Sequence, residues 1–351
     1  MLVVGFGGTL AALLIYAGEP KNGRPPQHLA ASPSAGHNAS NLPSELGSPD
    51  AAASSSLRAE TRPGAARRPA TPPREMAPFE SVTLECPQVT ESSGVAASRL
   101  RPGVFWTHND SGHGPDLFSF ELTGKHLGCH QIVGAKSVDW EDMAAVVLND
   151  VPYLVVGDTG NNGSQTRSTF ELYFVREPES PAQRLPLAGT VRFTYSQTAP
   201  DCEAFGIDPA TGTVLLVAKN YFSQATVYSF PLPANFPEPS DEISTAMPIG
   251  QILVPGATGM DISADGLRLV VGSYANAFQW RRTPDESWTQ AFKRPAQEIL
   301  IPARKQGEAV CYELDGRRIC LTSESRPTPF IRVQLSESAI NDPSARTDNS
   351  P

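Results

Sequence analysis

Three glutamates of this chain stand in one local setting, at the start of a short and mostly apolar run. They are Glu141 in WEDMAAV, Glu203 in CEAFGID and Glu308 in GEAVCYE; the related runs also contain Asp142 and, in GMDISAD, Asp261. Carboxylate oxygens are the ligands that Ca²⁺ prefers, and crowded carboxylates repel one another unless a cation or a proton intervenes. These five acids are therefore candidate metal ligands, provided that the fold brings them together.

The runs that contain these acids belong to a repeat of about 50 residues, a period typical of repeat architectures. Each repeat continues with a turn, a second apolar run and a third run rich in aromatic residues, and four repeats add a fourth run. Between Phe79 and Leu335 no segment has the periodicity of an amphipathic helix, so the predicted class is all-β. The opening runs are SSGVAAS (92–98), WEDMAAV (140–146), CEAFGID (202–208), GMDISAD (259–265) and GEAVCYE (307–313).

Five repeats of four strands predict a β-propeller with five blades. The fifth repeat ends at its third strand, while the strand FESVTLE, residues 79–85, precedes the first repeat. Pairing this N-terminal strand with the last sheet would close the ring and hide the sheet edges. Six blades are the alternative, but they would need a further unit of about 40 residues, which we do not find in the sequence.

The blade geometry predicts one shared polar opening. In an antiparallel blade the first strand begins, and the second strand ends, at the same face of the disc. The acids at the starts of the first strands should therefore meet the polar residues at or just beyond the ends of the second strands, and we expect these to bind a ligand. They are Asn109, Asp110, Asp158, Lys219, Asn220, Tyr274, Glu324 and, slightly further on, Arg326.

The charges at this opening have two alternative explanations. Lys219 and Arg326 can neutralise part of the acidic charge without any metal. The glutamates can also accept hydrogen bonds from backbone N–H groups where the strands begin, in which case they are structural. Small residues on the other face of the first strands, such as Gly94 and Ala96, are expected to face a narrow central axis.

The chain divides by composition into four segments. Residues 1–18 are predicted to be a signal peptide or signal anchor, 19–77 a disordered Pro/Ala/Ser linker, 78–335 the propeller and 336–351 a disordered tail. This organisation predicts an extracytoplasmic monomer, secreted or held at the membrane through its N-terminal segment alone. A formal net charge of −9 argues against nucleic acid as a partner.

Five cysteines leave at least one without a disulfide partner. If Asp315 and Gly316 form a two-residue turn, Cys311 lies opposite Cys320, within reach of a disulfide. Cys86 and Cys129 are the other suspected pair, and buried thiols are the alternative in each case. The sequence contains no G-x-S-x-G, HExxH, CxxC or Walker motif, so familiar hydrolase and kinase machinery is not expected.

The motifs WTHNDSG, DWEDMA, GDTGNN, DCEAFGID and QGEAV resemble those of exported bacterial β-propeller proteins, over most of Phe79 to Leu335. More distantly, the acids at the strand starts resemble those of phytase-type and esterase-like propellers. That resemblance implies clustered carboxylates that hold calcium ions and through them phosphate esters, and it carries over to Glu141, Asp142, Glu203, Asp261 and Glu308. The chain departs from this pattern: Met260 and Ser93 stand where a fourth and a fifth glutamate are expected, and no basic cluster for a phosphate ester is present.

Three functions are compatible with this pattern. The first is a propeller that binds Ca²⁺ and a small or polymeric ligand, without catalysis. The second is a metal-dependent hydrolase of phosphate esters, in which cations polarise the phosphoryl group and activate water. The third is an interaction scaffold without metal. Two adjacent metal sites would favour the hydrolase, whereas a single ion would favour binding.

Overall fold

The computed structural model describes residues 75–162, 167–180, 182–222, 224–238 and 241–340. The chain separates into a unit Met1–Pro69 and a unit Ala70–Pro351, and every described residue lies in the second. The predicted signal or anchor segment and almost all of the predicted linker are outside the described residues. Within the part that is described, no helix has the length and apolar character needed to cross a bilayer.

The regular secondary structure of the described residues is almost entirely β-strand, in five antiparallel groups of four strands that we call units 1 to 5. Unit 1 contains β2 (Ser92–Ala97), β3 (Val104–Asn109), β4 (Asp116–Glu121) and β5 (His126–Val133). Unit 2 contains β6 (Trp140–Leu148), β7 (Val151–Asp158), β8 (Phe170–Arg176) and β9 (Arg184–Tyr195). Unit 3 contains β10 (Cys202–Ile207), β11 (Thr213–Ala218), β12 (Ala225–Pro231) and β13 (Ile243–Ile252). Unit 4 contains β14 (Ala257–Ile262), β15 (Arg268–Ser273), β16 (Asn276–Arg281) and β17 (Gln297–Leu300).

Unit 5 is assembled from both ends of the described chain. It contains β18 (Val310–Tyr312), β19 (Arg318–Leu321), β20 (Pro329–Gln334) and β1 (Phe79–Thr83). β1 runs antiparallel to β20, with Phe79 opposite Val333 and Thr83 opposite Pro329. The strand predicted from residues 79–85 therefore supplies the fourth strand of the last sheet.

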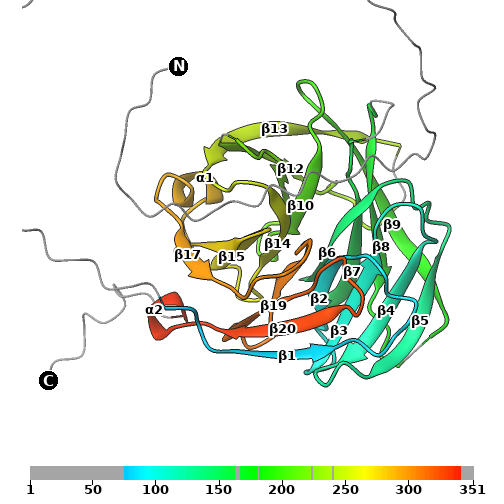
Figure 1. The fold of residues 1–351 in the computed structure, drawn as a ribbon. Coiled ribbons are helices and arrows are strands. Elements are labelled where there is room, and N and C mark those ends of the chain that lie inside the picture. Colours follow the sequence, from blue (N-terminus) through cyan, green and yellow to red (C-terminus); the bar gives the residue numbers. More distant parts are fainter. Residues whose placement is uncertain (1–74, 163–166, 181, 223, 239–240, 341–351) are drawn as a thin grey trace, which may run out of the picture. The chain divides into compact units, whose positions relative to one another are not determined.

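The first strands of the units lie toward the middle of this region, and the fourth strands lie toward its outside (Figure 1). β2 contacts β6, β6 contacts β10, β10 contacts β14, β14 contacts β18, and β18 contacts β2. All residues of β2, β10, β14 and β18 are buried. Small residues allow this close approach: a Cβ on Gly94 would lie 2.7 Å from the backbone nitrogen of Met143.

The hydrophobic core is divided into five clusters among the described residues, and each lies between two neighbouring units. They join units 1 and 2, 2 and 3, 3 and 4, 4 and 5, and 5 and 1. The apolar alternation of the strands explains this arrangement, because each buried sheet presents side chains to a neighbour on either face. Most of the stability of the domain must come from these interfaces, since apolar burial is the main favourable term in folding.

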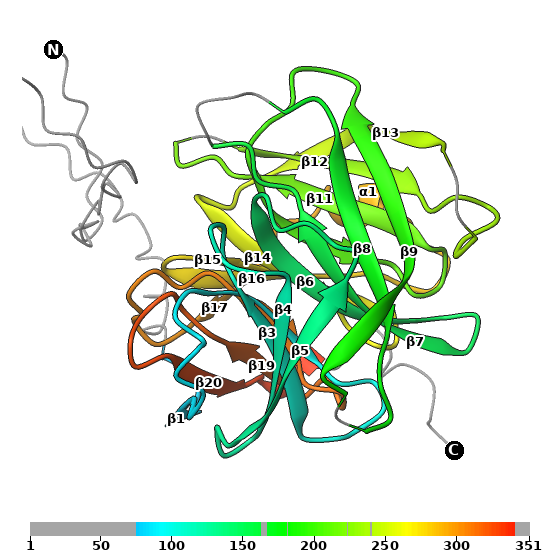
Figure 2. The ribbon, with the colours of Figure 1, turned by 90° about the vertical axis from the view of Figure 1, so that its right-hand side faces the viewer.

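The outer strands connect three of the units further. β9 pairs in parallel with β13 over Arg192–Tyr195 and with β5 over Arg184–Pro186, so units 1, 2 and 3 form one continuous twelve-stranded sheet. Figure 2 shows the long strand β9 beside β8 and β5. Units 4 and 5 remain separate four-stranded sheets.

Two short helices differ from the sequence-based prediction. No helix is predicted between Phe79 and Leu335, yet α1 (Trp288–Ala291) forms one turn there, stabilised by a capping box between Ser287 and Gln290. The second, α2 (Glu337–Ile340), falls in the predicted disordered tail and buries Ala339 against the core between units 4 and 5. A four-residue helix is too short for periodicity to reveal.

The predicted disulfides are not formed, and all five cysteines are free. The predicted register is correct, because Cys311 lies directly opposite Cys320. Both thiols and that of Cys86 are buried in the cluster between units 5 and 1, and Cys129 packs against the same cluster. They fill apolar volume as small hydrophobic side chains, which was the alternative to a bridge.

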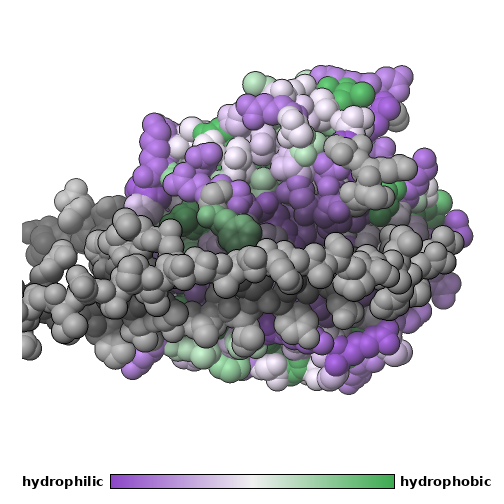
Figure 3. All heavy atoms as spheres, turned by 45° about the horizontal axis from the view of Figure 1, so that its top comes forward, coloured by the Kyte–Doolittle hydropathy of each residue, from purple (hydrophilic) through white to green (hydrophobic). Residues whose placement is uncertain are grey.

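The face of the molecule seen in Figure 3 is mostly hydrophilic, with hydrophobic residues in small separate groups. Large hydrophobic side chains that are exposed occur in several units. Tyr221 and Phe222, exposed at 53% and 89%, are adjacent in the sequence and follow Lys219 and Asn220 beyond β11. This pair lies near the candidate site.

Candidate functional site

The first strands of four units begin with the same irregularity. The pairing register between first and second strand shifts at Ser93, Glu141, Glu203 and Thr258, each of which is an extra residue opposite the second strand. Such β-bulges redirect a side chain away from the regular alternation of the strand. Glu308 stands two residues before Val310, the first residue of β18. Glu141 and Glu203 therefore occupy the bulge position of their first strands, and Glu308 lies just before the first strand of unit 5.

The register corrects one sequence-based assignment. Trp140 pairs with Asp158 and Asp142 with Gly157, as Ala257 pairs with Ser273 and Gly259 with Gly272. Thr258, rather than Met260, thus corresponds to Glu141. The Thr258 hydroxyl donates to the carbonyl oxygen of Gly307 at 3.1 Å, so this position in unit 4 is structural.

Five carboxylates lie close together, and two of them belong to the bulged residues Glu141 and Glu203. We call them the acidic cluster: Asp110, Asp139, Glu141, Asp201 and Glu203. One ligand oxygen each of Asp110, Asp139 and Glu141 lie within 4.8 Å of one another, and the same holds for Glu141, Asp201 and Glu203. Glu141 belongs to both triads, and Glu141 and Glu203 are only 5% and 4% exposed. The predicted residues Asp110, Glu141 and Glu203 are therefore brought together from units 1, 2 and 3.

Asp139 and Asp201 were not predicted as ligands. Both stand two residues before a bulged glutamate, in Asp139-Trp140-Glu141 and Asp201-Cys202-Glu203. The repeated spacing D-x-E at the start of two first strands is the signal that could have identified them. In unit 5 the same place is taken by Gln306, ahead of Glu308.

One oxygen of the acidic cluster is buried without a hydrogen-bond partner among the described residues: Oε1 of Glu141. Burial of a carboxylate oxygen without a donor is costly, so such an atom calls for an explanation, for which an ion is one candidate. The oxygen faces the loop that follows β7. A Cβ on Gly160 would lie 2.2 Å from Glu141 Oε1 and 2.4 Å from Asp139 Oδ2.

The loop after β7 forms one wall of the acidic cluster. The backbone N–H of Gly160 donates to the carbonyl of Asp139 at 3.1 Å, and that of Asn161 donates to Oδ1 of Asp201 at 3.0 Å. This loop is part of the stretch DTGNNG, of which Gly163 is outside the described residues. Asp158, a predicted ligand-binding residue, is bound instead by Arg167 at 2.6 Å and by the backbone N–H of Asp139 at 3.1 Å.

A second group of charged residues adjoins the cluster. The Lys219 ammonium forms an ion pair with Glu203; burial raises the pKa of nearby Glu308, and the charge of Lys219 opposes that rise. The positive charge of Arg304 also acts to lower the pKa of Glu308. The Arg304 guanidinium itself donates a hydrogen bond to the carbonyl oxygen of Ser273 at 2.9 Å. Arg304 was not predicted; Arg326, which was, is exposed on the loop between β19 and β20.

Burial and mutual repulsion shift the protonation of these acids. Burial raises the pKa of Glu141 well above its ordinary value, and the charges of Glu203 and Asp110 raise it further. Burial also raises the pKa of Glu203, although Lys219 opposes this shift. The pKa of Asp139 rises to about 6, first through burial and then through the charges of Asp110 and Asp201. Near neutral pH the site therefore contains negative charge that the folded chain accommodates poorly.

These pKa shifts predict that acid stabilises the cation-free protein. A carboxyl group whose pKa is higher in the folded than in the unfolded state holds more protons when folded, so stability falls as pH rises through that interval. For Asp139 the interval runs from its ordinary 3.8 to about 6, with Asp110, Asp158, Asp201 and Arg167 as the surrounding charges. We expect a higher melting temperature near pH 5 than near pH 7.5 in chelator, measured by circular dichroism, and a smaller difference with Ca²⁺.

Replacing Asp139 by Asn is the matched control for this pH dependence. The variant should lose part of the difference in melting temperature, since its side chain does not titrate. A wild-type melting temperature that rises steadily from pH 5 to pH 7.5 in chelator would contradict the prediction.

Two predicted metal ligands lie outside the two triads and accept backbone hydrogen bonds. Asp142 is fully buried; its Oδ1 accepts the N–H of Met143 at 2.8 Å, and its Oδ2 accepts those of Phe205 at 3.2 Å and Met260 at 2.8 Å. It thereby connects β6, β10 and β14. Asp261 connects β14 and β18, because it accepts the N–H of Ile262 and of Tyr312, each at 2.8 Å. Backbone donors thus satisfy oxygens of both carboxylates, and Arg99 Nη2 also lies 3.9 Å from Oδ1 of Asp261.

Three other predicted ligand-binding residues make local contacts. Oδ1 of Asn109 accepts the backbone N–H of Thr90 at 2.8 Å and of Glu91 at 3.1 Å. Asn220 accepts the N–H of Phe222 at 3.1 Å, and Glu324 accepts the Gln306 amide at 3.1 Å. These contacts shape the loops around the cluster.

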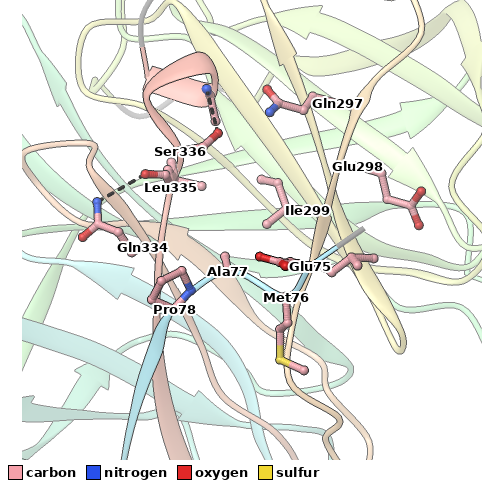
Figure 4. A pocket seen from close by; sticks show the side chains of 12 residues that line it. Glu75, Met76, Ala77, Pro78, Gln297, Glu298, Ile299, Gln334, Leu335 and Ser336 are labelled. Atoms are coloured by element: carbon pink, nitrogen blue, oxygen red, sulfur yellow. Dashed lines mark hydrogen bonds between the residues drawn. The ribbon is translucent and has the colours of Figure 1, made fainter. Parts of the chain in front are cut away.

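A cavity of about 500 Å³ lies apart from the acidic cluster and shares no residue with it. Figure 4 shows Ile299, from β17, opposite Ala77 and Met76, which precede β1, with Leu335 and Ser336 at one side. Its titratable side chains are Glu75 and Glu298, and Glu298 is bound by Asn276 at 2.6 Å. The cavity therefore lacks a convergent set of reactive groups.

Searches with the whole sequence found no protein-family model that matches the chain and no curated protein that is similar to it. What the site does must therefore be argued from its own chemistry.

Proposed function

We propose that units 1 to 5 form a five-bladed β-propeller, with β1 completing the last blade. The cyclic contacts of the first strands and the five core clusters between successive units support this architecture. The pairing of β1 with β20 supports ring closure by the N-terminal strand. A sixth unit, as in the alternative, does not occur among the described residues.

We propose further that the acidic cluster binds one divalent cation, Ca²⁺, through Asp110, Asp139, Glu141, Asp201 and Glu203. The observation that carries this proposal is the buried, unpartnered Oε1 of Glu141, which lies at the junction of two carboxylate triads. Ca²⁺ takes six to eight oxygen ligands in flexible geometry, so carboxylates from several loops suit it. The bound ion would offset the repulsion that raises the pKa values of these acids.

The function that this site supports best is cation-dependent binding of a small or polymeric ligand outside the cytoplasm. Exposed Tyr221 and Phe222 beside the cluster offer apolar surface for such a ligand. Cys202 is the thiol nearest in sequence to Glu203, but burial raises its pKa to about 12, so it is a poor nucleophile. Hydrolysis of a phosphate ester is the second candidate, because two overlapping triads could hold two adjacent ions.

A Ca²⁺ titration of the full chain tests the cation site. We expect the melting temperature to rise with Ca²⁺, since a ligand at one hundred times its Kd stabilises the folded state by about 2.7 kcal/mol. Glu141→Gln should abolish this rise because it removes the ligand that both triads share. Glu324→Gln is the matched control, because Glu324 lies outside the triads, and it should respond as the wild type does.

A screen with p-nitrophenyl phosphate separates the two candidate functions. A binding module should show no Ca²⁺-dependent turnover, whereas turnover that Glu141→Gln removes would favour the hydrolase. If neither Ca²⁺ nor Mg²⁺ raises the melting temperature of the wild type, the cation site is refuted and the scaffold without metal is the remaining reading.

A further inference from the structure

Tyr221 is an exposed aromatic residue close to the acidic cluster. It lies two residues beyond Lys219, which directly follows β11, and it is 53% exposed. The next residue, Phe222, is 89% exposed. Aromatic side chains offer a large contact area and lose little conformational entropy when a ligand covers them, so exposed rings beside a polar site are candidate anchors for that ligand.

The ring of Tyr221 is supported by a second tyrosine. It lies parallel to the ring of Tyr274, with an interplanar angle of 6° and 6.2 Å between the ring centres. Gly256 lies against both rings: its φ is 65°, and a Cβ there would be 3.3 Å from Tyr274 and 3.4 Å from Tyr221. The Gly256 N–H also donates to the carbonyl oxygen of Asn220 at 2.8 Å. We call Tyr221 and Tyr274 the tyrosine platform.

The tyrosine platform borders the acidic cluster through Lys219. The Lys219 ammonium nitrogen lies 5.6 Å from the ring centre of Tyr221 and 5.2 Å from that of Tyr274, within the range of cation–π attraction. The same ammonium forms an ion pair with Glu203, a member of the acidic cluster. One buried lysine therefore contacts both the aromatic and the acidic part of this surface.

These two parts attract different chemical groups. The face of an aromatic ring carries partial negative charge, so it attracts flat apolar surface with polarised C–H groups. Carboxylates accept hydrogen bonds from hydroxyl groups, and Ca²⁺ takes hydroxyl oxygens as ligands. A sugar ring presents both features, because its C–H groups form a flat face and its hydroxyl groups form the rim.

The charges of the surface disfavour an ionic ligand. An anionic ligand would meet the five carboxylates of the acidic cluster, and the Lys219 ammonium is already paired with Glu203. A cationic ligand on the platform would meet the same ammonium, which lies near both tyrosine rings. A neutral ligand avoids both repulsions.

We propose that the tyrosine platform stacks a sugar ring of a neutral carbohydrate, whose hydroxyl groups face the acidic cluster. The inference rests on the proposed function and names the class of its ligand. Phe222 offers apolar surface for a further sugar unit, which suits a polymeric carbohydrate.

An array of neutral oligosaccharides built from glucose, mannose, galactose or N-acetylglucosamine tests this inference, with the full chain in Ca²⁺. We expect binding of at least one of them. In calorimetry with that oligosaccharide, Tyr221→Ala should weaken binding at least about tenfold, the scale of an aromatic anchor, whereas Tyr221→Trp should stay within about threefold of the wild type. Phe79→Ala is the matched control, because Phe79 is 47% exposed but lies in β1, and it should bind as the wild type does.

Titration with Ca²⁺ alone separates this inference from the cation site. Tyr221 belongs to neither triad, so Tyr221→Ala should bind Ca²⁺ as the wild type does. A wild type that binds Ca²⁺ but no neutral oligosaccharide would refute the platform, as would a Tyr221→Ala variant that binds the sugar as tightly as Phe79→Ala. Binding of oligogalacturonate or choline in place of the neutral sugars would also refute it. Tyr221-dependent sugar binding without any Ca²⁺ binding would instead refute the cation site and leave the platform standing.

Discussion

Asp142→Ala is expected to lower the free energy of unfolding by about 3–9 kcal/mol, since it leaves three buried N–H donors without an acceptor at roughly 1–3 kcal/mol each. The donors belong to Met143, Phe205 and Met260, and therefore to β6, β10 and β14. Asp142 is fully buried where these strands meet. Urea unfolding followed by tryptophan fluorescence measures the change.

Asp241→Ala is the matched control for Asp142→Ala. Asp241 is exposed and pairs with Arg192 at the surface, so its removal should cost less than about 1 kcal/mol. Asp142→Asn should fall between the two, because an amide keeps one acceptor but presents an N–H donor toward another donor. An Asp142→Ala variant as stable as Asp241→Ala would show that the carboxylate does not hold the first strands together.

Gly160→Ala is expected to weaken Ca²⁺ binding by at least about tenfold, which corresponds to about 1.4 kcal/mol of binding free energy. The new Cβ would lie 2.2 Å from Glu141 Oε1 and 2.4 Å from Asp139 Oδ2, so both carboxylates would have to move. They are the ends of flexible side chains, and the fold should therefore tolerate the change while the ligand geometry does not. Calorimetric titration with Ca²⁺ measures the Kd.

Gly250→Ala, in β13, provides the control for this glycine substitution. A Cβ at Gly250 would meet nothing within 4 Å, so both the Kd for Ca²⁺ and the melting temperature should remain close to those of the wild type. If Gly160→Ala binds Ca²⁺ as tightly as Gly250→Ala, the ion does not depend on the positions of Glu141 and Asp139.

Much of the strand pattern could be predicted because each repeat contains its own local signals. Alternating apolar residues and turn dipeptides define the strands, and the missing fourth strand of the last repeat directed attention to residues 79–85, now β1. The convergence of Asp110, Glu141 and Glu203 followed from strand direction alone. These inferences needed only periodicity, which the sequence displays directly.

The sequence could not reveal features that depend on three-dimensional neighbours. Asp142 and Asp261 are acidic residues of the type that binds metals. Their carboxylates accept hydrogen bonds from the backbone N–H groups of Phe205, Met260 and Tyr312, which lie on strands distant in the sequence. A bulge moved the unit 4 equivalent of Glu141 from Met260 to Thr258, and a bulge leaves no mark in the spacing of apolar residues. Cys311 and Cys320 were placed correctly in register, yet register alone does not decide whether two thiols oxidise.

The pairing of β1 with β20 has a consequence for biosynthesis. β1 leaves the ribosome before every other described strand, but its partner is complete only when Gln334 has been made. Until then its backbone donors and acceptors have no sheet to join, so this pairing must wait for translation of β20. A nascent chain halted before Pro329 would therefore carry an unsealed β-edge, the kind of surface that chaperones shield and that promotes aggregation.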